Sequence, residues 1–184
     1  MKTKEAWSGE FGNEYTKRNW VDWQARIPFW KMIIDKTGAR SAYEFGCNAG
    51  WNLSAIQRAF PDVQVCGYDV NEEAAQRARE AGLQDVFDVS YDIDRAELVF
   101  TAGVLIHIPP KALKKVMKGL LNRSYDYVLA VEYDADEETE VEYRDGVGLW
   151  KRPYGKLYQD LGLKLIETGI AVGFDNCRYH LLQK

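Results

Sequence analysis

The segment between residues 41 and 69 limits the possible folds of this chain more than any other part of the sequence. An apolar run at 41–45 leads into a loop with two glycines, and the residues after the loop have helical spacing until Pro61. A second apolar run at 63–68 ends at an aspartate. Strand, glycine turn, helix and strand in this order predict a parallel β-α-β unit.

The same alternation continues toward the C-terminus and predicts an α/β fold. Further strands are expected at 86–89, 97–101, 125–131, 164–170 and 178–182, and further helices at 23–36, 71–82, 111–121 and 154–160. Each parallel crossover needs a helix to return the chain, so we expect helices on both faces of the sheet. The predicted fold is Rossmann-like, with a mostly parallel seven-stranded sheet whose last two strands form a C-terminal antiparallel hairpin.

The length of 184 residues suits one domain with a substantial core and no separate substrate domain. We expect a single domain in which residues 1–38 form an N-terminal helical cap and residues 39–184 form the Rossmann-like core. Residues 134–148 interrupt the alternation with a strongly acidic stretch that contains glycine. Such a stretch is typical either of a lid or binding loop or of a disordered, solvated insertion.

The composition of the chain narrows its location and its partners. No stretch approaches the roughly 18 apolar residues of a membrane helix, and the N-terminus lacks the apolar core of an export signal. We therefore expect a cytoplasmic protein without a membrane partner. Its 24 Lys and Arg residues against 28 Asp and Glu residues argue against a large nucleic-acid interface. No zinc-ligand or Ser-His-Asp spacing is present, so no metal is expected.

The loop after the first strand has the pattern Glu44-x-Gly46-x-x-x-Gly50, and the next strand ends at Asp69. Glycine supplies the positive φ that a tight turn needs and lets backbone N–H groups approach a ligand. An acid at the end of the second strand accepts hydrogen bonds from the ribose hydroxyls of an adenosine group. A dinucleotide would need the tighter G-x-G-x-x-G turn, and the Glu44 carboxylate would repel a diphosphate. The pattern resembles the first motif of class I methyltransferases and predicts S-adenosylmethionine as the cofactor, with S-adenosylhomocysteine as its product.

Ligands of this fold lie outside the C-terminal ends of the strands. The segment after the third strand is therefore expected to border the adenine, with Asp88, Ser90, Tyr91 and Asp92 as candidates. Small residues after the fourth strand leave room for the cofactor. The predicted cofactor-binding residues at the strand ends are Glu44, Gly46, Cys47, Asn48, Gly50, Asp69, Val70, Ser90, Tyr91, Thr101, Ala102, Gly103 and Val104.

His107 is the histidine nearest to the predicted centre of the site. Its neutral imidazole is suited to take a proton from a hydroxyl or amine acceptor during methyl transfer. The alternative is a structural histidine that bonds the backbone and closes the loop before Pro109. Tyr15, Glu132 and Tyr133 are expected to line the acceptor pocket, and the predicted catalytic residues are His107, Tyr15 and Glu132.

Several segments of the chain resemble one family of methyltransferases. They are FGNEYTKRN (11–19), EFGCNAGWNL (44–53), VFTAGVLIHI (99–108), EYD (132–134) and LWKRPYG (149–155). On these segments the chain is similar to the pseudaminic acid biosynthesis-associated methylases, a small group of class I methyltransferases. The resemblance implies the class I fold and the cofactor S-adenosylmethionine. It also implies that a cap over the cofactor is formed by Tyr15, Thr16, Arg18 and Asn19.

Three functions remain open for a chain with this predicted site. The first is methyl transfer to a small molecule such as a sugar or sugar nucleotide, which the cofactor motif and the net charge of -4 favour. The second is methyl transfer to a protein or nucleic acid through the basic and aromatic residues at 17–20 and 150–152. The third is binding of the cofactor without catalysis.

Overall fold

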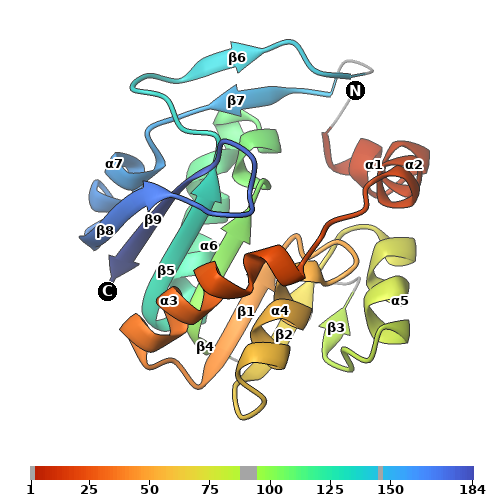
Figure 1. The fold of residues 1–184 in the computed structure, drawn as a ribbon. Helices are drawn as coiled ribbons and strands as arrows, with labels where there is room; N and C mark the ends of the chain where they lie inside the picture. Colours follow the sequence, from red (N-terminus) through yellow and green to blue (C-terminus); the bar gives the residue numbers. More distant parts are fainter. Residues whose placement is uncertain (1–2, 88–94, 145–146) are drawn as a thin grey trace.

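The computed structural model describes residues 3–87, 95–144 and 147–184. These residues form the predicted mostly parallel sheet of seven strands, in the order β3-β2-β1-β4-β5-β9-β8 (Figure 1). Strands β1 to β5 run parallel, whereas β9 is antiparallel to both of its neighbours, β5 and β8. The strands are β1 (Ser41–Phe45), β2 (Gln64–Tyr68), β3 (Val86–Phe87), β4 (Ala96–Ala102), β5 (Ser124–Glu132), β8 (Lys164–Ile170) and β9 (Arg178–Gln183).

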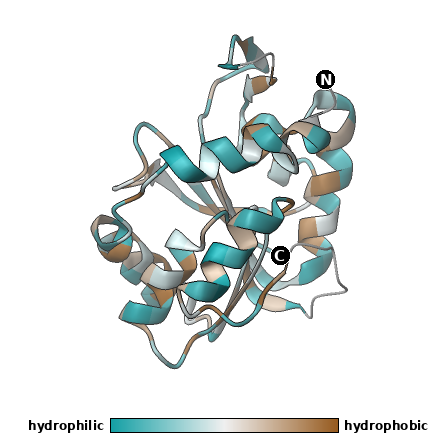
Figure 2. Ribbon diagram, turned by 90° about the vertical axis from the view of Figure 1, so that its right-hand side faces the viewer, coloured by the Kyte–Doolittle hydropathy of each residue, from teal (hydrophilic) through white to brown (hydrophobic). Residues whose placement is uncertain are grey.

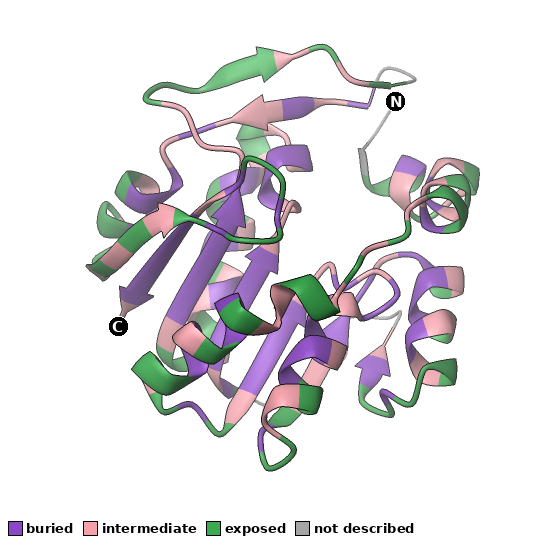
Figure 3. Ribbon diagram, in the orientation of Figure 1, coloured by how far each residue is buried: buried purple, intermediate pink, exposed green. Residues whose placement is uncertain are grey.

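Helices cover both faces of the sheet, as predicted. Helices α3, α4 and α5 pack on one face, and α6 and α7 pack on the other (Figure 1). The outer surfaces of the helices are mainly hydrophilic (Figure 2), and the strands between the two layers are mainly buried (Figure 3). The helices are α3 (Ile27–Thr37), α4 (Trp51–Ala59), α5 (Glu72–Glu80), α6 (Pro110–Arg123) and α7 (Tyr154–Gln159).

Local side-chain chemistry explains where several of these elements begin and end. The Asn71 side chain accepts a hydrogen bond from the Ala74 N–H at 2.9 Å and so caps α5. Gly38 ends α3 in the left-handed region, at a φ of 64°. Strand β3 is described only as far as Phe87, because its expected continuation at 88–89 lies outside the described residues.

The N-terminal residues form two short helices, α1 (Thr3–Trp7) and α2 (Glu10–Arg18), although their sequence has no clean hydrophobic period. We call these two helices the cap; they lie at the end of the sheet where the parallel strands finish (Figure 1). The buried residues of α2 are Gly12 and Thr16, so its docking face is small and polar rather than apolar. The division of the domain after residue 38 stays a prediction, and α3, which precedes that boundary, packs on the sheet.

The acidic stretch at 134–148 contains a strand that the sequence did not predict. Strand β6 (Thr139–Val141) pairs antiparallel with β7 (Leu149–Lys151), and β6 is largely exposed (Figure 3). The partner strand follows the acidic stretch directly, and the ladder joins Val141 to Leu149 and Thr139 to Lys151. Strand propensity depends strongly on such pairing, so the exposed residues of β6 alone gave little sign of a strand. The described residues 139–141 therefore form a strand rather than a disordered insertion, while a role as a lid or binding loop stays a prediction. We call the described residues of 134–152 the arm.

No helix in the described part of the chain is both long enough and apolar enough to cross a membrane. Within the same residues, no group of three His, Cys, Asp or Glu side chains is arranged to hold a metal ion. The expected cytoplasmic location stays a prediction.

Candidate functional site

A cavity of about 790 Å³ lies at the C-terminal ends of β1, β2 and β4, between the sheet and the cap. Small-molecule sites usually have volumes of about 300–1,000 Å³, so this cavity has a typical size. The cap contributes Trp7, Tyr15 and Thr16 to its wall, and the residues that follow the three strands contribute the opposite side. The predicted residues that line it are Tyr15, Gly46, Asn48, Asp69, Val70, Ala102, Gly103, Val104 and His107.

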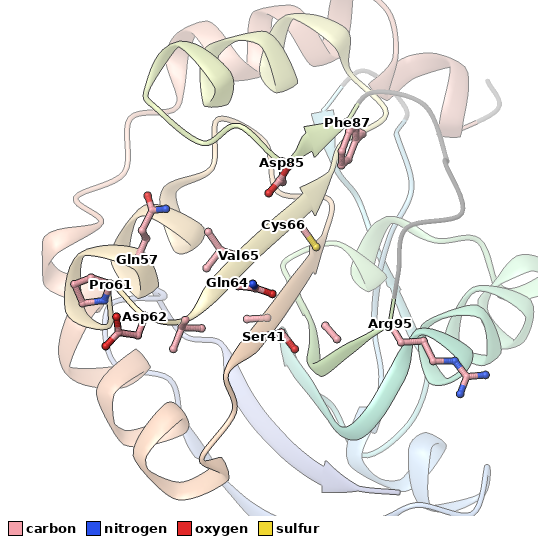
Figure 4. Close-up of a pocket in the computed structure, with 13 residues that line it drawn as sticks. Ser41, Gln57, Pro61, Asp62, Gln64, Val65, Cys66, Asp85, Phe87 and Arg95 are labelled. Atoms are coloured by element: carbon pink, nitrogen blue, oxygen red, sulfur yellow. The ribbon is translucent and has the colours of Figure 1, made fainter.

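A second cavity, of about 730 Å³, lies at the opposite end of the strands (Figure 4). Its wall includes Ser41, Gln64 and Ala96, which are the first residues of β1, β2 and β4. Ligands of parallel α/β sheets bind at the C-terminal strand ends, and none of the residues described in this wall belongs to the glycine loop. The cavity beneath the cap is therefore the candidate site.

The two glycines of the loop have the predicted positive φ angles, 78° at Gly46 and 76° at Gly50. A Cβ atom at Gly46 would lie 2.5 Å from a methyl carbon of Val104, and both of these residues line the cavity. A Cβ atom at Gly50 would instead overlap the side chain of Leu83, which follows α5. Gly50 thus makes room for core packing, and only Gly46 lies at the cavity.

Asp69 follows β2 directly and is 8% exposed. Its Oδ2 atom accepts the Asn48 N–H at 2.7 Å, and its Oδ1 atom accepts the Asn71 N–H at 2.9 Å. Burial raises the pKa of the Asp69 carboxyl, and the two hydrogen bonds lower it. A carboxylate has about four acceptor positions, so two positions remain for a ligand in the cavity. This capacity fits the two hydroxyls of a ribose.

Glu44 lies one residue before the end of β1, is 1% exposed and is not itself part of the described cavity wall. Its Oε1 atom accepts a hydrogen bond from Nδ2 of Asn52 at 2.6 Å, and its Oε2 atom has no hydrogen-bond partner among the described residues. Burial raises the pKa of the Glu44 carboxyl to about 8, while Asn52 and Arg26 act to lower it. A buried polar atom without a partner is costly, so this oxygen would stabilise a cationic group of a ligand.

Asn52 connects Glu44 to a cation that the sequence did not reveal. Arg26 ends the 3-10 helix η1 (Gln24–Arg26) and donates from Nη1 to Oδ1 of Asn52 at 2.9 Å. It also donates from Nε to the Gly173 carbonyl at 3.0 Å. Asn52 lies within a segment that carries the family resemblance, which could have drawn attention to it. Nothing near Arg26 in the sequence marks it, because its partners come from distant parts of the chain.

Hydrogen bonds from two asparagines hold the cap on the loops of the cavity. Asn71 donates from Nδ2 to the Trp7 carbonyl at 3.0 Å and to Oδ1 of Asn13 at 2.7 Å. Asn48 donates from Nδ2 to Oγ1 of Thr16 at 3.2 Å. The segment FGNEYTKRN therefore docks through Asn13 and Thr16, of which only Thr16 was implied by the resemblance.

Tyr15 is the cap residue that was predicted both to bind the cofactor and to act in catalysis. Its ring lies 5.0 Å from that of Trp7, and burial raises the pKa of its hydroxyl. Arg18 is exposed, with its guanidinium carbon 5.8 Å from the centre of the Tyr15 ring, and the Asn19 N–H donates to the Tyr15 carbonyl at 2.9 Å. Tyr15 and Thr16 line the cavity, whereas Arg18 and Asn19 are not part of its wall.

His107 ends a second 3-10 helix, η2 (Leu105–His107), and lines the cavity. Its Nδ1 atom lies 3.0 Å from the carbonyl oxygen of Gly148, and its ring contacts those of Trp7 and Tyr143. A carbonyl only accepts, so Nδ1 carries the proton and Nε2 keeps a lone pair. Burial lowers the pKa of His107 to about 4, and the ring is therefore neutral at pH 7. This arrangement allows Nε2 to take a proton.

Glu132 ends β5 and is fully buried. Its Oε1 atom accepts the N–H groups of Val104 and Leu105 at 3.2 and 3.1 Å, and its Oε2 atom accepts that of Ile106 at 3.4 Å. Burial raises the pKa of this carboxyl to about 7, and the backbone hydrogen bonds lower it. The carboxylate binds the turn that carries His107, and Glu132 is not part of the described cavity wall.

The remaining predicted residues lie around the cavity without lining it. Cys47 and Thr101 are buried in the core, and burial raises the pKa of Tyr133 to about 12. The predicted roles of four residues stay predictions, because these residues lie outside the described part of the chain: Asp88, Ser90, Tyr91 and Asp92.

Part of the cavity wall is apolar, and the sequence analysis missed several of the residues that form it. The rings of Phe45 and Tyr68 are stacked, with their centroids 5.4 Å apart and 29° between their planes. Ala112 and Val116 of α6 belong to the same wall. Phe45 and Tyr68 are the last residues of β1 and β2, which was the available clue. A flat apolar surface of this kind suits a planar base.

No protein-family model and no curated protein sequence matches this chain. Solved structures do match its fold. Human N-acetylserotonin methyltransferase in complex with S-adenosylmethionine aligns with a TM-score of 0.74 and 14% identity, over 100% of this chain and 59% of that one. The sugar N-methyltransferase of a Streptoalloteichus species aligns with a TM-score of 0.71 and 14% identity, over 96% and 93% of the two chains.

The magnesium protoporphyrin IX methyltransferase of Synechocystis, with bound S-adenosylmethionine, has a TM-score of 0.67 and 13% identity, over 98% of this chain and 94% of that one. At such low identities the similarity shows the fold. This chain has the Rossmann-like fold of these methyltransferases.

Proposed function

We propose that this chain is an S-adenosylmethionine-dependent methyltransferase whose acceptor is a small molecule. The observation that carries the proposal is the pairing of two acids at the C-terminal ends of neighbouring strands: Asp69 lines the cavity, and Glu44 directly precedes the wall residues Phe45 and Gly46. Asp69 has acceptor positions left for ribose hydroxyls, and nearby Glu44 has a buried oxygen without a hydrogen-bond partner among the described residues. A nucleoside that also bears a cationic group satisfies both requirements, whereas a diphosphate would place negative charge beside Asp69 and would supply no donor to Glu44.

The residues in and beside the cavity fit the parts of this cofactor. Glu44 would bind the α-ammonium group, Asp69 would bind the ribose, and the stacked rings of Phe45 and Tyr68 would lie against the adenine. When bound, S-adenosylmethionine supplies a methyl group already activated by a sulfonium. The protein then has to orient the acceptor, exclude water and, for a hydroxyl or amine acceptor, remove a proton.

His107 is the residue we assign to proton removal. It lines the cavity, its ring is neutral, and its Nδ1 proton is held by the Gly148 carbonyl, so Nε2 is the basic atom. Tyr15 and Trp7 of the cap cover the same part of the cavity and would shield it from water. The bond to the Gly148 backbone is also what the structural alternative predicts, so the observation that supports the catalytic assignment is the position of His107 in the cavity wall.

Two observations support a small acceptor. The cap is hydrogen-bonded over the cavity through Asn71 and Asn48, which limits access by a large partner. The matching solved structures include a sugar N-methyltransferase and an N-acetylserotonin methyltransferase. Together with the resemblance to pseudaminic acid-associated methylases, they make a sugar or sugar nucleotide the first acceptor class to test.

Calorimetry with S-adenosylmethionine, S-adenosylhomocysteine and NAD tests the cofactor assignment. We expect the wild type to bind the first two ligands and not NAD, and we expect Asp69→Ala to weaken their binding by about 10-fold or more, because two hydrogen bonds are lost. Circular dichroism would verify that the variant is folded. No binding by the wild type, or unchanged binding in a folded variant, would contradict the proposal. Formation of S-adenosylhomocysteine with a panel of sugars and sugar nucleotides then tests the acceptor class.

A further inference from the structure

The short helix η2 is bonded on two sides by buried charged side chains. The Glu132 carboxylate accepts the N–H groups of Val104, Leu105 and Ile106. The guanidinium of Arg152 is fully buried and donates from Nη1 to the Leu105 carbonyl and from Nη2 to the Ile108 carbonyl, both at 2.9 Å. The backbone donors of the turn thus face an anion, and its carbonyls face a cation.

This arrangement compensates for the weakness of a three-residue helix. A turn as short as η2 makes few hydrogen bonds of its own and leaves most of its terminal N–H and C=O groups without intrahelical partners. An anion near the N–H end and a cation near the carbonyl end also agree with the helix dipole. Lysine could not replace Arg152 fully, since only a planar guanidinium reaches two carbonyls and a carboxylate at once.

The same arginine connects η2 to the arm. Arg152 follows β7 and donates from Nε to Oε2 of Glu138, ahead of β6, at 2.6 Å. Gly148, just before β7, provides the carbonyl that holds Nδ1 of His107. Tyr143, also in the arm, packs its ring 5.1 Å from that of His107. The arm therefore holds the His107 ring directly and holds its backbone through Arg152.

We infer that Glu132 and Arg152 are positioning residues that fix the His107 ring, with Nδ1 bonded to Gly148 and Nε2 available at the cavity. Glu132, which the sequence suggested as a catalytic residue, acts here through the backbone of η2. The arm is consequently part of the site, because it supplies both Arg152 and the carbonyl that selects the tautomer of His107. The catalytic meaning of this arrangement rests on the proposed methyltransferase function, but the tautomer itself does not.

NMR of the imidazole nitrogens tests the inference without an acceptor. The chain has only two histidines, so the signals of His107 are identified by their loss in His107→Gln. In the wild type we expect the Nδ1-protonated tautomer and a titration midpoint well below 6.5. In Arg152→Met and Glu132→Gln we expect a mixture of tautomers and a midpoint higher by about one pH unit or more, because the loosened ring becomes solvated. Among the described residues, Glu132, Tyr143 and Arg152 contact the ring or η2, and Glu138 and Tyr154 lie beside Arg152.

Matched variants separate positioning from general stability. Lys156→Met removes an exposed cation of α7 and should leave the His107 signals unchanged. Arg152→Lys should give an intermediate result, and it provides the measurement if Arg152→Met does not fold. An unchanged tautomer and midpoint in the folded Arg152 and Glu132 variants would overturn the inference.

Measurements of activity provide a second, independent test. Once an acceptor is known, kcat should fall by about 10- to 100-fold in Arg152→Met, as expected for a misplaced base, while the Kd for S-adenosylmethionine changes little. If the wild type fails to bind S-adenosylmethionine, the proposed function is contradicted, but the NMR result on the positioning of His107 still holds. An equal loss of cofactor binding and turnover would instead show that Arg152 supports the whole cavity, and would contradict the inference.

Discussion

The ends of β1 and β5 each carry a buried glutamate, and the two residues have opposite hydrogen-bonding situations. Glu44 is 1% exposed and Glu132 is fully buried. Burial raises the pKa of both carboxyls, to about 8 and about 7. Glu132 uses both oxygens to bind three backbone N–H groups, whereas Glu44 keeps one oxygen without a partner among the described residues. Similar burial thus accompanies two different hydrogen-bonding situations.

The difference shows how a fold separates a structural acid from a ligand-binding acid. A carboxylate bonded to the protein's own backbone stabilises the turn around it. An unsatisfied buried carboxylate oxygen costs about 1–3 kcal/mol, and a ligand that supplies a donor removes this cost. The β5 end holds η2 through Glu132, and we propose that the β1 end receives a cation from outside the chain.

The largest expected effect is on cofactor affinity at the β1 end. Glu44→Gln keeps the size of the side chain and removes its charge, so we expect the Kd for S-adenosylmethionine to rise by about 10- to 100-fold, as for the loss of a charge-assisted hydrogen bond. Calorimetry measures this change. Glu97→Gln, at the other end of the sheet, is the matched control and should bind like the wild type. Equal affinities in all three proteins would remove the distinction between the two strand ends.

A smaller effect is expected on stability at the β5 end. In Glu132→Gln the new amide NH₂ cannot accept an N–H group of η2, so at least one buried donor loses its partner. We expect the free energy of unfolding at pH 8 to fall by about 1–2 kcal/mol. Urea unfolding compares this variant with Glu44→Gln, which should match or exceed the wild type because it removes a poorly satisfied buried acid. If Glu132→Gln were instead more stable than Glu44→Gln, the proposed difference between the two glutamates would be contradicted.

The smallest effect is a proton released when the cofactor binds. With a pKa of about 8, the Glu44 carboxyl is mostly protonated at pH 7, and an ammonium group beside it favours the carboxylate. Binding should therefore release up to about one proton, and affinity should rise as the pH increases from 6 to 7.5. Calorimetry in buffers of different ionisation enthalpy counts the protons. Glu44→Gln should abolish the release; a release of the same size in this variant would assign it to another group.

The raised pKa values of the two glutamates also determine how the stability of the protein depends on pH. The folded-state pKa values of Glu44 and Glu132 lie above the ordinary value near 4.5, so the folded protein binds more protons than the unfolded chain between that value and about pH 8. These two acids therefore destabilise the ligand-free protein as the pH rises through this window. Cofactor binding opposes the part that comes from Glu44.

Local patterns were sufficient to predict most of the sheet and the part of the site that the glycine turn forms. The glycine turn between β1 and α4 and the Asn71 cap of α5 are short-range features, so their residues identify them without knowledge of the fold. The two helices of the cap show no clean hydrophobic period in the sequence, because α2 docks through Gly12 and Thr16. A Cβ atom at Gly12 would lie 2.7 Å from Nδ2 of Asn71, a restriction that only the docked structure reveals.

By itself the sequence determined the Rossmann-like sheet, the turn at Gly46 and the two acids at the ends of β1 and β2, because these depend on hydrophobic period and on residues close together in the chain. Only the tertiary structure decided what each acid does. Whether a carboxylate is satisfied depends on which backbone groups the fold brings to it, and the donors around Glu132 come from a turn 26 to 28 residues away. The tautomer of His107 depends likewise on a carbonyl of the arm, 41 residues further along the chain.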